Sequence, residues 1–326
     1  MTRYIIRRIL WFIPVLFAIM AVTFFMAKIM PGGPFDFAGE KQLPESVRQN
    51  LMRRYGLDAP THVQFARWLW NALQGDLGPS YYYKGRSVND VLAQTFPISA
   101  QLGLLSLFLG VFIGVPLGII AALKQNTIWD YMSTFVAILG VSIPNLVLGP
   151  LLIWIFALKL GWFPTARWGV NYQELVLGFF PPPDKWRTFL EHAVLPTVTL
   201  GTALSASIAR LTRASLLQVI REDYIRTARA KGLSERTIII VHALKNSMIP
   251  VVTVLGPMFA AVVTGSLIVE QIFAIPGMGK FFVASVTNRD YPVILGTTLL
   301  YSVLLVVANL FVDIVYAWLD PRIRYE

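Results

Sequence analysis

The sequence predicts an all-α integral membrane protein in which six helices cross the bilayer and a long external loop domain follows the first. Two observations carry this prediction. The 326 residues are 56% hydrophobic with a mean hydropathy of +0.60, whereas soluble domains are about half apolar. Six apolar runs also reach the length of about 20 residues that a membrane-spanning helix needs. These runs cover residues 9–30, 98–123, 132–158, 193–220, 247–269 and 293–319.

The first run belongs to an anchor segment over residues 1–30 and is not a cleavable signal peptide. It is longer than the apolar core of a signal peptide, and "MPGGPF" follows it in place of a small-residue cleavage site. Arg3, Arg7 and Arg8 precede it and predict a cytoplasmic N-terminus. An even number of spans then also places the tail over residues 320–326 and the basic connection over residues 221–246 in the cytoplasm.

Residues 31–97 form the predicted external loop domain, which is mixed in charge and too long for a turn. Within it, "LPESVRQNLMRRYGL" and "THVQFARWLWNAL" place apolar side chains at helical spacing, so we expect a small helical cap. A second outer segment over residues 161–191 contains three consecutive prolines, which exclude a helix at that point.

Residues 98–319 form the main transmembrane domain, and prolines interrupt several of its apolar runs. Each proline frees a backbone carbonyl, so such helices pack against protein or line a cavity. Helix breakers gather with small or polar residues in the third and fifth runs, which favours a translocation pathway there, although ordinary bundle kinks give a similar pattern. The candidate pathway residues are Asn145, Pro257, Met258, Thr264 and Gly265.

Charged side chains inside the apolar runs are few. Lys28 and Glu270 lie near the predicted span ends, where the charge can reach the interface. Asp313 lies deeper, where we favour a salt bridge or an interfacial position over a proton relay. A proton-coupled transporter would need several buried acidic groups, and this scarcity disfavours one.

The sequence offers no catalytic, cofactor or metal site. It contains no cysteine, and its three histidines lack metal-site spacing. "PGMGK" resembles the end of a phosphate-binding loop, but Ala274 and Phe281 stand where glycine and serine or threonine are required. Any ATP and magnesium used for transport would therefore bind to partner subunits. The net charge of +10 gathers at membrane-flanking positions, so we expect no nucleic acid partner.

The basic segment between the fourth and fifth runs predicts two short helices joined by a sharp corner. Asp223 is a suitable N-cap for the first helix, whose acidic start and basic end match the helix dipole. Gly232 is the expected left-handed residue after its C-terminus, and Ser234 the expected N-cap of the second helix.

This segment resembles the EAA loop of type I ABC importer permeases, in which EAAxxxG is followed by IxLP. Here "RTARAKG" places Arg226 at the glutamate position and Gly232 at the glycine, and "HALK" replaces IxLP. That variant is similar to the peptide-importer branch. The motifs "RRIL", "GDLGPSY", "ALKQNTIWDY", "TGSLIVEQIFAIPGMG", "NRDY" and "DPRIRY" extend the resemblance to the B-type permease subunit of oligopeptide importers over almost the whole chain.

The resemblance implies the type I importer permease fold in a bacterial inner membrane. It also implies an assembly with a homologous C-type permease, two cytoplasmic ATP-binding cassette subunits and an external peptide-binding protein. The expected function is ATP-driven uptake of oligopeptides, with dipeptides or nickel complexes as the alternative cargo. The resemblance assigns ATPase docking to Tyr224, Ile225, Arg226, Thr227, Ala228, Arg229, Ala230, Lys231, Gly232 and Leu233.

Overall fold

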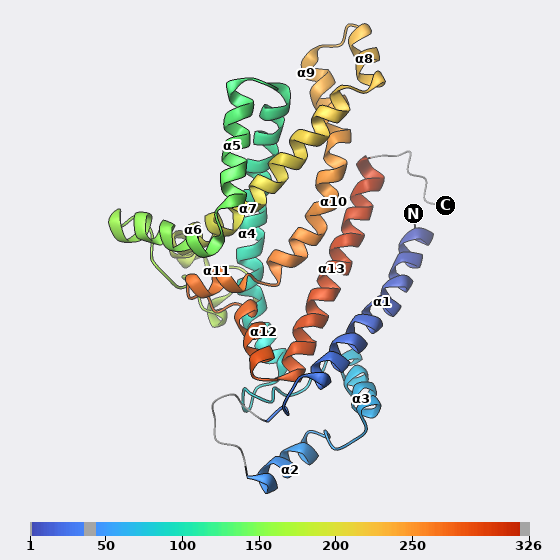
Figure 1. Ribbon diagram of the computed structural model, residues 1–326, viewed down its shortest axis with the longest axis vertical. Coiled ribbons are helices and arrows are strands. Elements are labelled where there is room, and N and C mark those ends of the chain that lie inside the picture. The colour runs from blue at the N-terminus through green and yellow to red at the C-terminus, as the bar shows by residue number, and fades with distance from the viewer. Residues whose placement is uncertain (1, 36–43, 320–326) are drawn as a thin grey trace.

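The computed structural model describes residues 2–35 and 44–319, which form a bundle of long helices with shorter ones at both ends (Figure 1). Within these residues, five helical segments are long and apolar enough to cross a membrane, and a bent pair of helices is a sixth candidate. The predicted tail over residues 320–326 lies outside the described residues. The main helices of the five segments are α1 (Thr2–Ile29), α4 (Val88–Leu123), α7 (Trp186–Ile220), α10 (Leu244–Val263) and α13 (Tyr291–Leu319).

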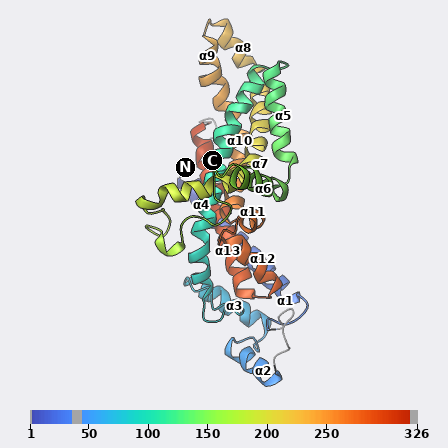
Figure 2. The same cartoon turned by 90° about the vertical axis from the view of Figure 1, so that its left-hand side faces the viewer.

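The third predicted span is broken, as the helix breakers within it predicted, and its two parts meet at a sharp bend. Helix α5 (Ile128–Ser142) and the segment 145–159, which comprises α6 (Asn145–Leu152) and a π-helical continuation (Ile153–Lys159), meet at an angle of 101°. Pro144 forces the bend, because Ile143 before it adopts an extended conformation. At 1.5 Å per residue, α5 alone is about 22 Å long and too short to cross the hydrocarbon core. The pair α6 and its continuation instead runs sideways from the bundle (Figures 1 and 2).

Helices α4 and α7 form the centre of the bundle, and three glycines let them approach closely. A Cβ on Gly114 would lie 2.6 Å from the Ser205 carbonyl oxygen, and one on Gly118 would lie 2.6 Å from that of Ala209. Gly110 meets Leu204 in the same way. This arrangement is the small-residue packing typical of membrane helices.

The small helical cap predicted within residues 31–97 is present in the structure. It comprises α2 (Glu45–Arg54) and α3 (Thr61–Leu73), and Phe65 of α3 packs with Met20 and Phe24 of α1 and Leu295 of α13. Helix α4 begins at Val88, well before the apolar run at residue 98, because Ser87 and Asp90 form a capping box. Within residues 161–191, Tyr172–Glu174 and Pro183–Lys185 form only short 3₁₀ turns.

The candidate fifth span covers Glu235–Ile272 and includes the predicted run over residues 247–269, although helix α10 itself ends at Val263. After α10 the chain turns into α11 (Leu267–Ile272) and α12 (Met278–Thr287), which lie between α10 and α13 in the sequence. At the opposite end of the molecule, α8 (Asp223–Ala230) and α9 (Glu235–Thr237) project beyond α7 and α10. The start of α1 and the end of α13 point toward the α8 end, and α2 and α3 lie at the other (Figure 1).

Candidate functional site

The predicted helix–corner–helix motif is present at the projecting end of α7. Helix α8 spans Asp223–Ala230, and its N-cap is Glu222, so the prediction of Asp223 as N-cap is wrong by one position. Neither side chain makes a capping hydrogen bond: Asp223 forms part of the first turn, where its charge still favours the helix dipole.

Gly232 forms the corner after α8 in a left-handed conformation, with φ of +77°. Its amide donates to the Arg229 carbonyl at 2.9 Å, and the Leu233 amide donates to that of Ala228 at 3.4 Å. These two bonds form a Schellman motif. Ser234 then caps α9 by accepting a hydrogen bond from the Thr237 amide. The corner is therefore fixed by local bonds on both sides, as the sequence predicted.

One face of α8 is buried against the bundle. Ile225 is fully buried and Ala228 is 8% exposed, and both pack with Ala122 of α4 and Leu216 of α7. Tyr224 adds polar contacts, since its hydroxyl donates to the His242 carbonyl at 3.4 Å and accepts from Asn246 Nδ2 at 2.8 Å. Helix α8 is thus held by three parts of the bundle, which a prediction based on the loop alone did not anticipate.

The other face of α8 is exposed and mostly cationic. Arg229 forms a 2.8 Å salt bridge with Glu235 across the corner, and Arg226 pairs with Asp223 at 3.2 Å. Such exposed pairs contribute about 1 kcal/mol or less. The remaining predicted docking residues on the solvent side are Thr227, Ala230, Lys231 and Leu233, all of which are exposed.

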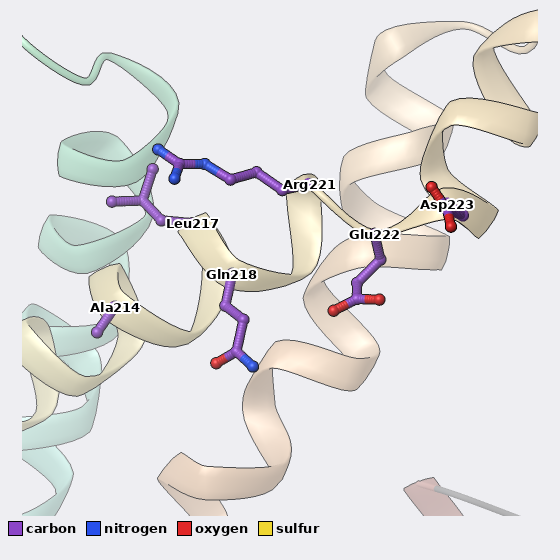
Figure 3. Close-up of a pocket in the computed structure, with 6 residues that line it drawn as sticks. All are labelled: Ala214, Leu217, Gln218, Arg221, Glu222 and Asp223. Atoms are coloured by element: carbon purple, nitrogen blue, oxygen red, sulfur yellow. The ribbon is translucent and has the colours of Figure 1, made fainter.

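An open hollow of about 500 Å³ lies where α7 passes into α8 (Figure 3). Leu217 and Arg221 point to one side of the chain there, and Gln218 and Glu222 point to the other. The hollow combines an exposed apolar wall with charges of both signs. Together with the exposed face of α8, it forms a rigid surface suited to a partner protein and contains no enclosed small-molecule site.

Comparison with known protein families identifies this architecture. Residues 114–325 match the family described as "Binding-protein-dependent transport system inner membrane component", and residues 1–103 match its N-terminal part. The chain belongs to this family. Membership implies a membrane location, a substrate-binding partner and ATPase partners, with ATP hydrolysis in separate subunits.

Individual relatives of this binding-protein-dependent component cover the chain from end to end. The oligopeptide transport system permease protein OppB of Escherichia coli is 44% identical over 100% of both chains. The dipeptide transport system permease protein DppB of Bacillus subtilis is also 44% identical, over 99% of this chain and 98% of its own. A solved structure of the MetNI methionine ABC transporter matches 69% of this chain and 94% of its own with 16% identity and a TM-score of 0.50, which supports the fold alone.

The structure separates the predicted pathway residues of this family member into two groups. Thr264 and Gly265 line a largely apolar cavity of about 350 Å³, together with Met278 and Phe282 of α12 and Tyr301 of α13. The residues that line this cavity do not include Asn145, Pro257 or Met258. The sequence analysis missed the α12 and α13 walls, because no local pattern shows that these helices fold back onto the end of α10.

Glu270 is fully buried, so its predicted position at an interface is wrong. Its carboxylate accepts hydrogen bonds from Ser99 Oγ at 2.6 Å and from the Lys280 amide at 3.3 Å. Gly265, Gly277 and Gly279 surround it so tightly that a Cβ on Gly265 would lie 2.5 Å from Glu270 Oε1. The carboxylate therefore holds α11, α12 and α4 together behind the apolar cavity. Bulky replacement of Gly265 would disturb this contact before it obstructed a pathway.

More acidic side chains are buried than the sequence predicted. Besides Glu270, the described residues bury Asp130, Asp290 and Asp313. Asp130 pairs with Arg213 at 2.8 Å, and Asp313 with Arg8 at 2.8 Å, which confirms the predicted salt bridge. Burial raises the pKa of Asp290, and bonds from Ser80 and backbone amides oppose this shift. Each of these carboxylates thus has a structural partner, and this engagement disfavours a proton-coupled transporter.

The described residues contain no group of three or more histidine or acidic side chains arranged to hold a metal ion. The backbone of the "PGMGK" segment donates hydrogen bonds to Ser99 and Glu270: the Met278 amide donates to Ser99 Oγ at 2.7 Å, and the Lys280 amide donates to Glu270 Oε2 at 3.3 Å.

Proposed function

We propose that this chain is the B-type permease subunit of an ATP-driven oligopeptide importer and forms half of its membrane pathway. The end-to-end match at 44% identity to an oligopeptide permease supports this cargo. A dipeptide permease matches equally well, so dipeptides are the second candidate, and nickel complexes follow from the resemblance of their permeases. Uptake measured with the cognate binding protein and peptides of two to five residues separates these cargoes: preference for two-residue peptides would contradict the first proposal.

The proposed mechanism rests on the two faces of α8: one packs against the bundle and the other is exposed. Its inner face is clamped by Ile225, Ala228 and Tyr224, and its outer face is free to enter a cleft of an ATPase subunit. Because α7 and α10 flank it in the chain, movement of α8 is transmitted directly into two membrane helices. We propose residues 224–233 as the docking element, with ATP and magnesium bound by the ATPases.

The proposed assembly contains this chain, a homologous C-type permease, two ATP-binding cassette subunits and an extracytoplasmic peptide-binding protein in the bacterial inner membrane. Co-purification tests it directly: two ATPases and a second permease are expected with this chain, and isolation of a functional transporter without ATPases would contradict it. The translocation pathway is proposed to pass Thr264 and Gly265, whose cavity is the described space nearest to the broken fifth span.

We further propose that both termini and α8 lie in the cytoplasm. The chain has no cysteine, so single cysteines can be labelled with an impermeant thiol reagent in intact cells. Lys84 and Arg236 are better positions than Ser87 and Ser234, because these serines cap α4 and α9. Labelling of Lys84→Cys without labelling of Arg236→Cys is expected, and the reverse pattern would contradict the orientation.

A further inference from the structure

A cavity of about 200 Å³ lies between the end of α1, helix α3 and the start of α13, in the half of the molecule opposite α8. The described residues that line it include no aspartate or glutamate. Its walls instead combine cations with aromatic rings, among them Lys28, Arg54, Arg67, Tyr55, Trp68 and Tyr81.

Lys28 is held at this cavity by neutral groups. Its Nζ donates to Gln64 Oε1 at 2.6 Å and lies over the rings of Phe24 and Tyr291, at 5.6 and 5.2 Å from their centroids. Gln64 is itself fixed by donating to the carbonyls of Leu57 and Ala59. These contacts orient the ammonium group but bring no negative charge to it from the described residues, and a partly buried cation is costly unless it is paired.

Arg67 adds a second positive charge to the same wall. Its guanidinium lies against the backbone of Gly56, where a Cβ would come within 2.5 Å of Nη1. Neither Lys28 nor Arg67 forms a salt bridge within the described part of the chain. Arg54 also borders a second, more open hollow that is lined by Asp76 and Asp90. The positive charge of the cavity is therefore assigned to Lys28 and Arg67.

Trp68 provides an independent indication of a ligand. Its indole Nε1 is buried and has no hydrogen-bond partner among the described residues, although the residue lines this cavity. A buried indole N–H normally has an acceptor. Two cations and an unsatisfied donor around one small cavity match an anion with several acceptor oxygens. The nearby carboxylate of Asp290 is engaged by Ser80 and by the Tyr81 amide.

We propose that this cavity binds the phosphate of a phospholipid headgroup in the leaflet opposite α8. The cavity lies where α1 ends and α13 begins, which is the depth of a bilayer interface. Basic pockets between membrane helices bind headgroup phosphates, and tryptophan and tyrosine concentrate at that depth. Lys28 and Arg67 supply the charge, and Trp68 Nε1 donates a hydrogen bond to a phosphate oxygen.

The test counts phospholipids that remain on the purified transporter by native mass spectrometry, after reconstitution with phosphatidylglycerol and mild delipidation. The Lys28→Gln, Arg67→Gln double variant is expected to retain lipid about 25-fold less well, since each cation contributes about fivefold. Trp68→Phe keeps the ring and removes the donor, so about a fivefold loss is expected. Lys84→Gln is the matched control, because Lys84 is exposed at the same end and does not line the cavity.

Retention by the double variant equal to that of Lys84→Gln would overturn the proposal. If the double variant unfolds at a lower temperature than the control, Trp68→Phe decides instead, and its unchanged retention would also overturn it. A final arm adds inorganic phosphate in place of lipid. Phosphate bound by the wild type and lost in Trp68→Phe, with no retained lipid, would assign the cavity to a free anion and contradict a lipid ligand.

Discussion

The corners at Gly232 and Gly265 follow the same backbone rule in opposite surroundings. Both glycines follow the end of a helix in a conformation with positive φ, +77° and +105° respectively. A Cβ on Gly232 would meet nothing within 4 Å, whereas one on Gly265 would meet Glu270 Oε1 at 2.5 Å and the Gly279 amide at 2.8 Å. Substitution therefore strains only the local turn at Gly232, but displaces a buried polar cluster at Gly265.

This difference corresponds to two tasks. The Gly232 corner directs an exposed helix, and under the proposed docking role it must be stiff and uncovered so that an ATPase subunit can reach α8. The Gly265 corner closes the chain around Glu270 and sets the wall of the apolar cavity, so its stiffness comes from neighbours on α4 and α12. We therefore expect substitutions at the two corners to differ in their effects on stability and on transport.

Gly265→Ala is expected to have the largest effect on stability. Positive φ for alanine costs about 1–2 kcal/mol and overpacking adds about 1–3 kcal/mol. Together they predict a loss of about 2–5 kcal/mol in the free energy of unfolding. Gly161→Ala is the matched control, since Gly161 has φ of +64° and nothing within 4 Å of its Cβ position. Equal destabilisation of both variants in denaturant titrations would remove the distinction between enclosed and open corners.

Glu270→Gln is expected to have the next largest effect. The amide keeps the volume but places an N–H₂ group where Ser99 and backbone amides donate, which leaves a buried donor unsatisfied at a cost of about 1–3 kcal/mol. Ser99→Ala should have a similar cost, because it also removes the acceptor of the Met278 amide. A double-mutant cycle in the free energy of unfolding checks the link: strictly additive effects would mean that the two side chains act independently.

Features that depend on neighbouring residues could be predicted from the sequence, whereas features that depend on residues far along the chain could not. Gly232 and Ser234 were identified correctly because caps depend on residues a few positions away. The proline at residue 144 indicated a break in the third run but not the 101° angle between the two parts, because that angle depends on the residues packed around α6. Glu270 was misplaced because its partner Ser99 is 171 residues distant, and no local pattern encodes that contact. Within the docking element, the inner role of Ile225 likewise required the positions of α4 and α7.

Tyr224→Phe is expected to have a small effect at the α8 attachment. The variant retains the ring and loses the hydroxyl that links His242 and Asn246, which costs about 1 kcal/mol. Peptide-stimulated ATPase activity of the reconstituted transporter should fall modestly. Asn246→Ala removes the same 2.8 Å bond and should match it, so a strong loss in one variant with none in the other would argue against a shared clamp.

We propose that the corner at Gly232, which aims α8, and not the charge of α8, couples transport to ATP hydrolysis. Gly232→Val adds strain of about 1–2 kcal/mol at an exposed turn. We expect its effect on global stability to be small compared with its effect on transport. Arg229→Ala removes only an exposed salt bridge with Glu235.

Peptide-stimulated ATPase activity, measured together with retention of the ATPase subunits in reconstituted transporter, tests this claim most directly. Gly232→Val is expected to lose stimulated activity or release the ATPases, Gly232→Asn to retain most of it because asparagine tolerates the left-handed conformation, and Arg229→Ala to show a mild loss. Full stimulated activity in Gly232→Val together with its abolition in Arg229→Ala would contradict the claim and assign the contact to charge.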